Sequence, residues 1–594
     1  MRSLADYLRS RNENRGERLD PHYWGFGGTK PLELPAKTGY RRRTPLTGKI
    51  MISHRMTLGL TSFLLASAAS AANPALAASC EGLTGLKLPN TTITMAQPEA
   101  AGAFTPPGAA AGTKPVPVAF CRVGGSIKPT SDSDIRFEVW LPRTGWAGRY
   151  ESVGNGGFAG AIPFGAMVRP LTAGSAVAGT DDGHQTEVNT QAEWALGHPE
   201  KIIDFGYRAV HLTAMVSKAI TSAFYGNKPK HSYFIGCSTG GREALTEAQR
   251  YPYDFDGISA GDPANQLVGL HSGDAANMKA FLASEAGYIS PSDVQKIGAA
   301  ITEQCDAVDG VKDGLINDPR ECRINLASLP LTAAQLKTYQ ALHDGPKTSS
   351  GKQIFPGIPF GSEAVGWTQY FTGPSFAEAH AKARRGILAN ETFANLVYQD
   401  PKWDFMRFDP DKGPADAEKA FGSIMDSTDP NLTGFKAHGG KLISYQGWAD
   451  SDITPFAMLN YYNSVVAAQG GAGGKTGASQ SANAGALDKT QAFYRVFMAP
   501  GMGHCGGGPG PNQFGQTGGD GDADHDVVAA LERWVEKGVA PKKIIATKYA
   551  GNDLTKGVQM TRPLCVYPQA ARYKGTGDTN DAGSFVCTDP ATAK

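Results

Sequence analysis

The sequence predicts an α/β fold in which a parallel β-sheet is interrupted by a helical insertion. Between residues 130 and 260, short apolar runs typical of strands alternate with segments that have helical apolar spacing. Strands that alternate with helices form parallel sheets. This alternation stops over residues 265–435 and returns at 441–445. We therefore expect one α/β domain, made of residues 78–264 and 436–594, that carries an inserted lid domain at residues 265–435.

The individual elements follow from the apolar period and from the turn residues between them. Strands are expected where apolar side chains alternate or form a short run bounded by glycine, proline or aspartate, and helices where they recur every three or four positions. A Gly/Ala/Ser-rich segment at residues 468–488 is expected to be a loop. The expected strands are 135–140, 150–153, 231–235, 256–260, 441–445 and 492–498, and the expected helices are 209–225, 243–250 and 527–537.

The composition limits the class of protein. A chain of 594 residues with 41% hydrophobic side chains has ample material for a globular core. Its 57 basic and 56 acidic residues leave a net charge of +1. This balance gives no reason to expect nucleic acid as a partner. The composition favours a globular protein, and no oligomeric state is predicted.

Residues 1–77 are expected to lie outside the fold, as an N-terminal extension followed by a signal peptide. The first fifty residues are polar and Arg-rich, and we expect translation to start downstream, at Met51 or Met56. A basic pair precedes the apolar run 56–72, and Ala-Leu-Ala follows at 75–77, which is typical of a secretory signal with its cleavage site. The run is too short and too rich in Ala and Ser for a membrane anchor. The prediction is a secreted or periplasmic protein, and lipidation at Cys80 is the weaker alternative.

A candidate catalytic triad appears in the predicted strand–helix pattern. Residues 236–240 read Gly-Cys-Ser-Thr-Gly, and such a turn between a strand and a helix exposes the hydroxyl of Ser238. In the α/β-hydrolase fold the chain order is serine, acid, histidine. His504 follows the strand 492–498 in a Gly-rich turn, and Asp450 lies in the first turn after the strand 441–445, with Asp452 as the rival acid. The sequence therefore predicts an α/β-hydrolase fold and a serine hydrolase.

An oxyanion hole needs two hydrogen-bond donors near the nucleophile. The residue after the nucleophile supplies one amide by its position, and this residue is Thr239. The second donor is expected from the glycine turn at 154–160, with the amide of Gly157 preferred and that of Gly156 as the alternative. The same turn does not match a dinucleotide-binding fingerprint, because Ala159 stands where a glycine is required.

All eight cysteines follow the predicted cleavage site. An even number of cysteines in an exported protein favours disulfides, and no Cys/His spacing indicates zinc. Cys237 directly precedes Ser238, and Cys505 directly follows His504. If these two cysteines bond, the candidate nucleophile and base are linked covalently.

An acidic run occupies residues 306–315 and contains Asp306, Asp309 and Asp313. Three carboxylates so close together repel one another unless a cation neutralises them, and oxygen ligands with glycine turns suit Ca²⁺. The spacing is not that of an EF-hand, because position 12 of such a loop would be Asn317. The residues alone leave two interpretations open, a calcium site and a solvated Asp/Gly turn.

The Cys237-Ser238, Asp450 and His504-Cys505 set resembles the tannase/feruloyl esterase family of secreted α/β-hydrolases, and the resemblance covers most of residues 80–590. The resemblance implies a Cys237–Cys505 bond between nucleophile and base. It also implies a structural Ca²⁺ and three further disulfides. The implied ligands are the side chains of Asp306, Asp309 and Asp313 with the carbonyls of Val311 and Leu315, and the implied pairs are Cys80–Cys121, Cys305–Cys322 and Cys565–Cys587.

The expected function is hydrolysis of small aromatic esters, those of hydroxycinnamic or hydroxybenzoic acids, through an acyl-enzyme. One alternative is hydrolysis of mono(2-hydroxyethyl) terephthalate, although this chain lacks the additional lid disulfide of the family member with that activity. A second alternative is a non-catalytic, calcium-stabilised binding protein. Four aromatic side chains are candidates for stacking on the acyl group, with core packing as the alternative for each: Phe158, Trp403, Phe405 and Trp448.

Overall fold

A computed structural model of the chain describes residues 78–470, 480–516 and 521–589. The described residues all belong to one compact unit. The predicted N-terminal extension and signal peptide, residues 1–77, lie outside the described residues. None of the helices in the described ranges combines the length and the apolar character needed to span a bilayer.

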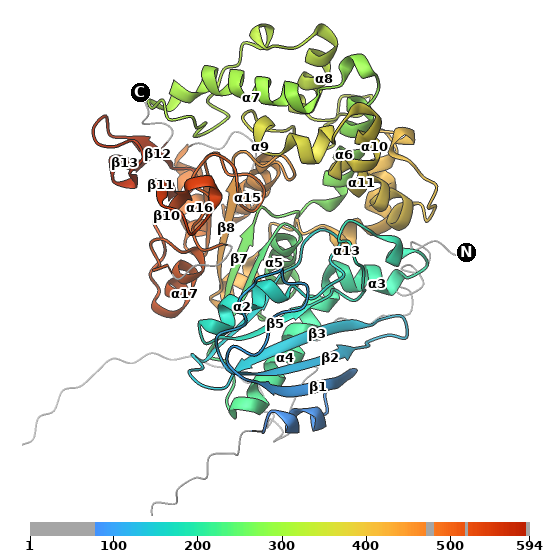
Figure 1. Ribbon diagram of the computed structural model, residues 1–594, viewed down its shortest axis with the longest axis vertical. Helices are drawn as coiled ribbons and strands as arrows, with labels where there is room; N and C mark the ends of the chain where they lie inside the picture. The colour runs from blue at the N-terminus through green and yellow to red at the C-terminus, as the bar shows by residue number, and fades with distance from the viewer. Residues whose placement is uncertain (1–77, 471–479, 517–520, 590–594) are drawn as a thin grey trace, which may run out of the picture. The chain divides into compact units, whose positions relative to one another are not determined.

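The core of the fold is a nine-stranded sheet with the order β1-β2-β3-β5-β4-β6-β7-β8-β9 (Figure 1). Neighbours from β5 through β9 run parallel, which confirms the predicted parallel sheet, whereas β1, β2, β3 and β5 pair antiparallel. The strands are β1 (Thr91–Glu99), β2 (Phe120–Ile127), β3 (Ile135–Pro142), β4 (Arg149–Val153), β5 (Ala176–Thr180), β6 (His231–Cys237), β7 (Gly257–Gly261), β8 (Lys441–Gly447) and β9 (Tyr494–Ala499).

Strands β1, β2 and β5 were not predicted. Strand β1 forms the edge of the sheet, and only one of its nine side chains is buried, so it lacks the apolar alternation of a covered strand. Strand β5 is a short run of small residues, and β2 contains two adjacent glycines. Both strands are largely buried, but their small residues and glycines leave no clear apolar alternation in the sequence.

Helices cover both faces of the sheet, and the alternation of side chains along each strand assigns them. Phe234 packs with α4, α5 and α15, whereas the adjacent Tyr233 packs with α17 on the other face. Trp140, on β3, packs with α2 on the face of the sheet toward which its side chain points. The described helices outside the segment between β7 and β8 are α2 (Phe164–Thr172), α3 (Pro199–Ile203), α4 (Ala209–Tyr225), α5 (Thr239–Arg250), α15 (Pro455–Gln469), α16 (Gln480–Gln491) and α17 (Val527–Lys537).

Two of the predicted helices have capping residues at their ends. The prediction of a loop over 468–488, by contrast, is partly wrong. Helix α4 ends at Gly226, which adopts the left-handed φ of 70°. Helix α17 begins at Asp526, whose carboxylate accepts two backbone amides, and ends at Gly538. Helix α16 begins at Gln480, inside the segment expected to be a loop, because its alanine content supports a helix despite the low complexity. Residues 471–479 of that segment lie outside the described ranges.

The segment between β7 and β8 is helical, as the sequence indicated (Figure 1). Capping boxes at Ser290 and Thr332 begin α7 and α8. Helices α6 and α11 pack against one another. The helices of this insertion are α6 (Leu267–Phe281), α7 (Pro291–Cys305), α8 (Ala333–Asp344), α9 (Glu363–Trp367), α10 (Phe376–Lys382), α11 (Arg384–Glu391), α12 (Gly413–Ala417), α13 (Ser423–Met425) and α14 (Thr433–His438).

The C-terminal segment adds two small antiparallel pairs, β10 (Lys543–Tyr549) with β11 (Val558–Cys565) and β12 (Ala570–Tyr573) with β13 (Phe585–Thr588). All four implied disulfides are formed, which confirms each pairing. One joins the two candidate catalytic loops, one ties the N-terminal residues to β2, one closes the acidic loop and one links β11 to β13: Cys237–Cys505, Cys80–Cys121, Cys305–Cys322 and Cys565–Cys587.

Candidate active site

Ser238 occupies a strained turn between β6 and α5, with φ 65° and ψ −122°. Such a conformation is costly for a residue with a side chain, and strained residues cluster at active sites. The glycines of the motif permit the turn. A Cβ on Gly236 would lie 2.4 Å from the carbonyl oxygen of Gly240, and a Cβ on Gly154 would lie 2.6 Å from the Cα of Gly240. The Gly-x-Ser-x-Gly pattern therefore reflects close backbone contacts between β6, α5 and the glycine turn.

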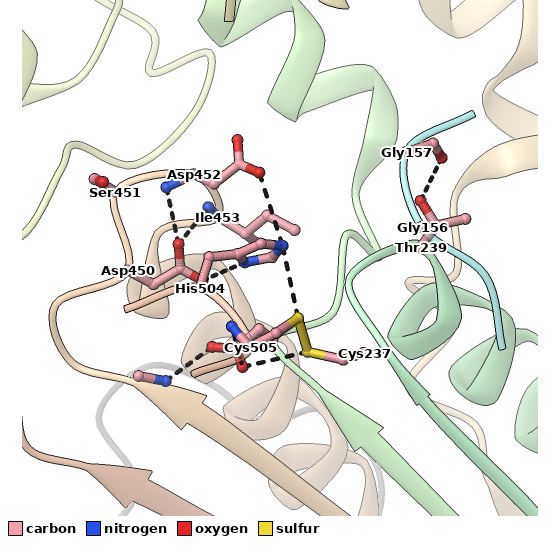
Figure 2. Close-up of polar contacts among 12 residues, drawn as sticks. Gly156, Gly157, Cys237, Thr239, Asp450, Ser451, Asp452, Ile453, His504 and Cys505 are labelled. Carbon is pink, nitrogen blue, oxygen red and sulfur yellow. Dashed lines mark hydrogen bonds and ion pairs between the residues drawn. A yellow bond between two sulfur atoms is a disulfide. The ribbon is translucent and has the colours of Figure 1, made fainter. Parts of the chain in front are cut away.

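Asp450 follows β8 and points toward the ring of His504 (Figure 2). Its Oδ2 atom lies 2.8 Å from Nδ1 of His504 and accepts a second hydrogen bond, of 3.0 Å, from the side-chain amide of Gln446. Its Oδ1 atom accepts the backbone amides of Asp452 and Ile453 at 2.8 and 3.0 Å. These donors stabilise the ionised carboxylate and aim it at the imidazole. The geometry favours Asp450 over Asp452 as the orienting acid.

The other ring nitrogen of His504 is the one that would act on a serine hydroxyl. Its Nε2 atom lies 3.7 Å from Oδ2 of Asp452 and 3.7 Å from the sulfur of Cys505 (Figure 2). Among the described residues, no hydrogen bond is recorded between this nitrogen and Ser238. Catalytic hydrogen bonds often tighten only when substrate binds. The structure thus shows a direct hydrogen bond between Asp450 and His504, whereas Ser238 is connected to them only through the chain and its cross-links.

The Cys237–Cys505 disulfide is such a cross-link, because it joins the residue before Ser238 to the residue after His504. The Cα atoms of the two cysteines are 6.0 Å apart. A covalent link between two loops that follow different strands limits how far the two catalytic side chains can separate. The positions of Ser238 and His504 are therefore coupled through the bond that the resemblance implied.

Asp262 directly follows β7 and lies next to this disulfide. It is a buried carboxylate that was not predicted from the sequence. Its two oxygens accept the amides of Gly447 at 2.8 Å and Cys505 at 3.2 Å, so it ties the acid loop to the base loop. Burial raises its pKa well above the usual range, and the nearby charge of Asp450 acts in the same direction. Its place at the carboxyl end of a parallel strand was the only signal in the sequence.

Three carboxylates set the protonation of His504. Burial alone lowers the pKa of an imidazole, but the charge and hydrogen bond of Asp450, with further contributions from Asp452 and Asp262, outweigh it. Together they raise the pKa of His504 to about 10. The imidazolium, which is the form that appears after proton abstraction from a nucleophile, is therefore strongly stabilised.

The predicted oxyanion donors lie next to Ser238. The backbone amides of Thr239, Gly156 and Gly157 donate no hydrogen bond to any other described residue. The Thr239 hydroxyl donates a 2.5 Å hydrogen bond to the carbonyl oxygen of Gly157, which joins the glycine turn to the first turn of α5 (Figure 2). Gly157 has φ 59°, and a Cβ there would lie 2.3 Å from the carbonyl oxygen of Asn189. Only glycine fits this position without strain.

The acidic loop is closed by the Cys305–Cys322 disulfide and is held largely by its own backbone. Each of its three aspartates uses Oδ1 to accept backbone amides further along the loop. A buried guanidinium, that of Arg562, donates to the other oxygen of Asp313 at 2.6 Å. The recorded amide donors are Asp313 and Gly314 to Asp306, Val311 to Asp309, and Leu315 to Asp313.

The donor set of this loop fits a calcium ion. The buried residues Val311 and Leu315 have carbonyl oxygens to which no hydrogen bond is recorded from the described residues. Burial, together with the charge of Asp313, raises the pKa of Asp309 to about 6, against the opposing charges of Arg562 and Arg572. Unpaired carbonyl and carboxylate oxygens are the ligands that Ca²⁺ takes. Elsewhere in the described chain, sets of three potential ligand atoms lie within 4.8 Å of one another. The carboxylates of this loop do not converge that closely.

The four aromatic candidates for substrate binding are all packed in the interior. Phe158 follows the glycine turn and contacts the rings of Phe205 and His271. Trp448 faces Arg320 and lines a small cavity on the side of the acidic loop. These positions favour core packing over stacking on a substrate, and a role in binding remains a prediction. Within the insertion, Trp403 stacks on Phe393, and Phe405 stacks on His380.

Comparison with known proteins gives one answer over most of the chain. The family model described as tannase and feruloyl esterase matches residues 121–588. An uncharacterised esterase of Xanthomonas campestris pv. campestris is 42% identical over 86% of this chain and 91% of its own length. A probable feruloyl esterase B-2 of Aspergillus terreus is 32% identical over 88% of this chain and 97% of its own.

A solved structure agrees with these relatives. The crystal structure of feruloyl esterase B from Aspergillus oryzae is similar with a TM-score of 0.75 and 28% identity, and the match covers 86% of this chain and 99% of that one. This similarity confirms the predicted α/β-hydrolase fold, and the extent of the family match assigns the chain. The chain therefore belongs to the tannase and feruloyl esterase family, and it is a carboxylic ester hydrolase.

Proposed function

We propose that the chain hydrolyses esters of hydroxycinnamic or hydroxybenzoic acids through a Ser238–His504–Asp450 acyl-enzyme mechanism. The observation that carries this proposal is the Asp450–His504 hydrogen bond held next to Ser238 by the Cys237–Cys505 disulfide. The substrate class rests on the family resemblance and on relatives described as feruloyl esterases. An aromatic acyl group is therefore the first to test.

In the first half of the proposed reaction, His504 Nε2 accepts the proton of Ser238 as Oγ attacks the ester carbonyl carbon. Asp450 keeps the proton on Nδ1 and stabilises the imidazolium. The amides of Thr239 and Gly157 receive the negative charge that develops on the carbonyl oxygen. His504 then gives its proton to the leaving alcohol, and the aromatic acid remains bound to Ser238 as an ester.

In the second half, water replaces the alcohol. His504 takes a proton from this water, hydroxide oxygen bonds to the acyl carbon, and the same oxyanion donors bind the second tetrahedral intermediate. The intermediate collapses, Ser238 recovers its proton from His504, and the free acid leaves. His504 thus takes a proton and gives it back once in each half of the reaction.

We also infer that the acidic loop binds a structural Ca²⁺ and that the mature protein is secreted or periplasmic. The calcium would be held by Asp306, Asp309 and Asp313 with the carbonyls of Val311 and Leu315, and it would supply positive charge to a loop with a buried carboxylate. Export is supported by the pairing of all eight cysteines, because such bonds persist in oxidising compartments.

The proposed function is tested by a hydrolysis panel on the protein from residue 78 onward, with Ser238→Ala as the control variant. The panel contains methyl ferulate, methyl gallate and mono(2-hydroxyethyl) terephthalate. Turnover of the first or the second ester that is lost in Ser238→Ala supports the proposal. Turnover of the terephthalate ester alone would move the activity to that substrate. Hydrolysis that persists in Ser238→Ala, or a folded protein that does not react with a fluorophosphonate probe, would overturn the serine mechanism.

A further inference from the structure

The inserted domain contributes a buried arginine to the catalytic acid loop. Arg385 lies in the first turn of α11 and is 1% exposed. Its Nε and Nη2 atoms donate to the carbonyl oxygen of Ser451 at 3.1 and 2.7 Å, and Nη2 also donates to the carbonyl oxygen of Asp452. Both acceptors lie in the loop that begins with Asp450. A side chain from the insertion therefore contacts the backbone of the proposed active site.

The two peptide groups that Arg385 contacts are the same two that hold Asp450. The Ser451 carbonyl shares its peptide group with the amide of Asp452, and the Asp452 carbonyl shares its peptide group with the amide of Ile453. Both amides donate to Oδ1 of Asp450. In a trans peptide the carbonyl and the amide point in opposite directions. Arg385 on one side and Asp450 on the other thus fix the orientation of both peptide planes.

The charge of Arg385 is balanced inside the insertion. Its Nη1 atom forms an ion pair with Oδ1 of Asp274 on α6, and its guanidinium lies 4.6 Å from the ring centre of Phe371. Asp274 is also 1% exposed, so neither charge is accessible to water. A buried ion pair is often no more stable than an apolar replacement, so stability alone does not account for it. The planar fork of an arginine can bind two carbonyls and a carboxylate at once, which a lysine cannot do.

Asp274 extends this contact toward the oxyanion side. Its Oδ2 atom lies 3.2 Å from Nδ1 of His271, one turn earlier on α6. The ring of His271 packs 5.7 Å, centre to centre, from the ring of Phe158, which directly follows Gly157. Helix α6 therefore contacts the glycine turn while α11 contacts the acid loop. The insertion forms part of the frame around both sides of the proposed catalytic centre.

We propose that Arg385 is a positioning residue that holds the Asp450–Asp452 loop in register with His504, through its bonds to the Ser451 and Asp452 carbonyls and its pairing with Asp274. This inference rests on the proposed function, because it assigns Asp450 and His504 the roles of acid and base. Without the fork, the two peptide groups lose the partner that orients them, and Oδ1 of Asp450 loses aligned donors. The carboxylate then shifts relative to Nδ1 of His504, and transition-state stabilisation falls.

The test compares Arg385→Lys with the wild-type protein, because lysine keeps the positive charge and loses the fork. We expect kcat for methyl ferulate to fall roughly 10- to 100-fold with little change in KM, as for other small misplacements of catalytic groups. The acid limb of the kcat/KM profile should move to lower pH, because a displaced Asp450 supports the His504 imidazolium less well. The charged and titratable groups that face this site are Asp450, Asp452 and Asp262 around His504, and Arg384, Arg385 and the neutral Tyr370 around the two loop carboxylates.

A matched control separates positioning from folding. Arg122→Lys alters a different arginine, partly buried, which binds Glu138 through two hydrogen bonds on strands β2 and β3. It should lower Tm and leave kcat and the acid limb unchanged. The double variant Arg385→Met/Asp274→Leu removes the ion pair without leaving a buried charge, so it should fold and still show the loss in kcat.

Wild-type kcat and an unshifted acid limb in Arg385→Lys, with only Tm lowered, would overturn the positioning role while the esterase mechanism stands. The same result in the double variant would overturn it as well. Failure of the proposed function is recognised separately, since Ser238→Ala would then retain activity or the wild-type protein would not label with a fluorophosphonate. A loss of kcat in both Arg385 variants, with labelling of Ser238 slowed but not abolished, supports the inference.

Discussion

Arg385 and Asp450 bind the same two peptide groups: Arg385 donates to their carbonyls, and Asp450 accepts from their amides. Arg385 comes from the insertion and Asp450 from the end of a sheet strand. At this point the insertion contacts the loop that carries the proposed catalytic acid.

The disulfide between the catalytic loops should matter for turnover as well as for stability. Cys237→Ala/Cys505→Ala removes the link that limits the separation of Ser238 and His504, so we expect kcat to fall about 10-fold or more. Stability should fall by roughly 2–5 kcal/mol, as for other native disulfides. The measurements are kcat on methyl ferulate and the urea midpoint.

The control for this prediction is Cys565→Ala/Cys587→Ala, which removes a disulfide between β11 and β13 far along the chain from the catalytic residues. It should lower stability and leave kcat close to that of the wild-type protein. Equal turnover by both double variants would show that the catalytic-loop bond has no positioning role.

The pH profile should report the carboxylates around His504. Because they raise the pKa of His504 to about 10, the base is protonated below that pH, and kcat/KM should rise toward alkaline pH with an acid limb above the ordinary value of about 6.5. Asp452→Asn removes a negative charge 3.7 Å from Nε2, which destabilises the imidazolium. The pKa should fall, and the acid limb should move to lower pH.

The same protonation contributes to folding. A histidine whose folded pKa lies above its unfolded pKa stabilises the fold fully below about pH 6.5, and this contribution is lost as pH rises through about 10. The loss should be smaller in Asp452→Asn. An acid limb that stays in place in this variant, while Asp450→Asn abolishes activity, would contradict a role for Asp452 in setting the His504 pKa.

The glycine turn should tolerate no side chain at Gly157. In Gly157→Ala the new Cβ would meet the Asn189 carbonyl at 2.3 Å, and φ 59° is unfavourable for alanine, so the turn must move. A displaced oxyanion donor should lower kcat about 10-fold or more, with a smaller effect on KM. Gly165→Ala adds a Cβ with no atom within 4 Å and serves as the control. Similar kcat values for the two variants would argue against Gly157 as a donor.

Calcium removal should destabilise the acidic loop. We expect dialysis against a chelator to lower Tm and added Ca²⁺ to restore it, because binding to the folded state shifts the unfolding equilibrium. Metal analysis of the purified protein should find about one calcium per chain. Asp309→Asn should lower this content, whereas Asp411→Asn, an exposed aspartate outside the loop, should not. A wild-type protein without bound metal and with a calcium-independent Tm would leave the loop as a self-contained Asp/Gly turn.

The sequence by itself determined the chain order of Ser238, Asp450 and His504 and their places after parallel strands. These features are local, since strand alternation, turn glycines and the nucleophile motif each lie within a few residues. The four disulfide pairs, by contrast, came from the family resemblance, because spacing alone allows many pairings, and the structure confirmed them.

Only the tertiary structure decided which side chains surround the triad. Asp262 and Arg385 look like an ordinary loop aspartate and an ordinary helical arginine in the sequence, yet both bond to the catalytic loops. Trp403 and Phe405, for which the sequence left stacking on a substrate and core packing open, contact Phe393 and His380 within the insertion. The physical reason is the same in each case. Such contacts join segments far apart in the chain, and periodicity describes only the face that a residue occupies, not the partner that it meets.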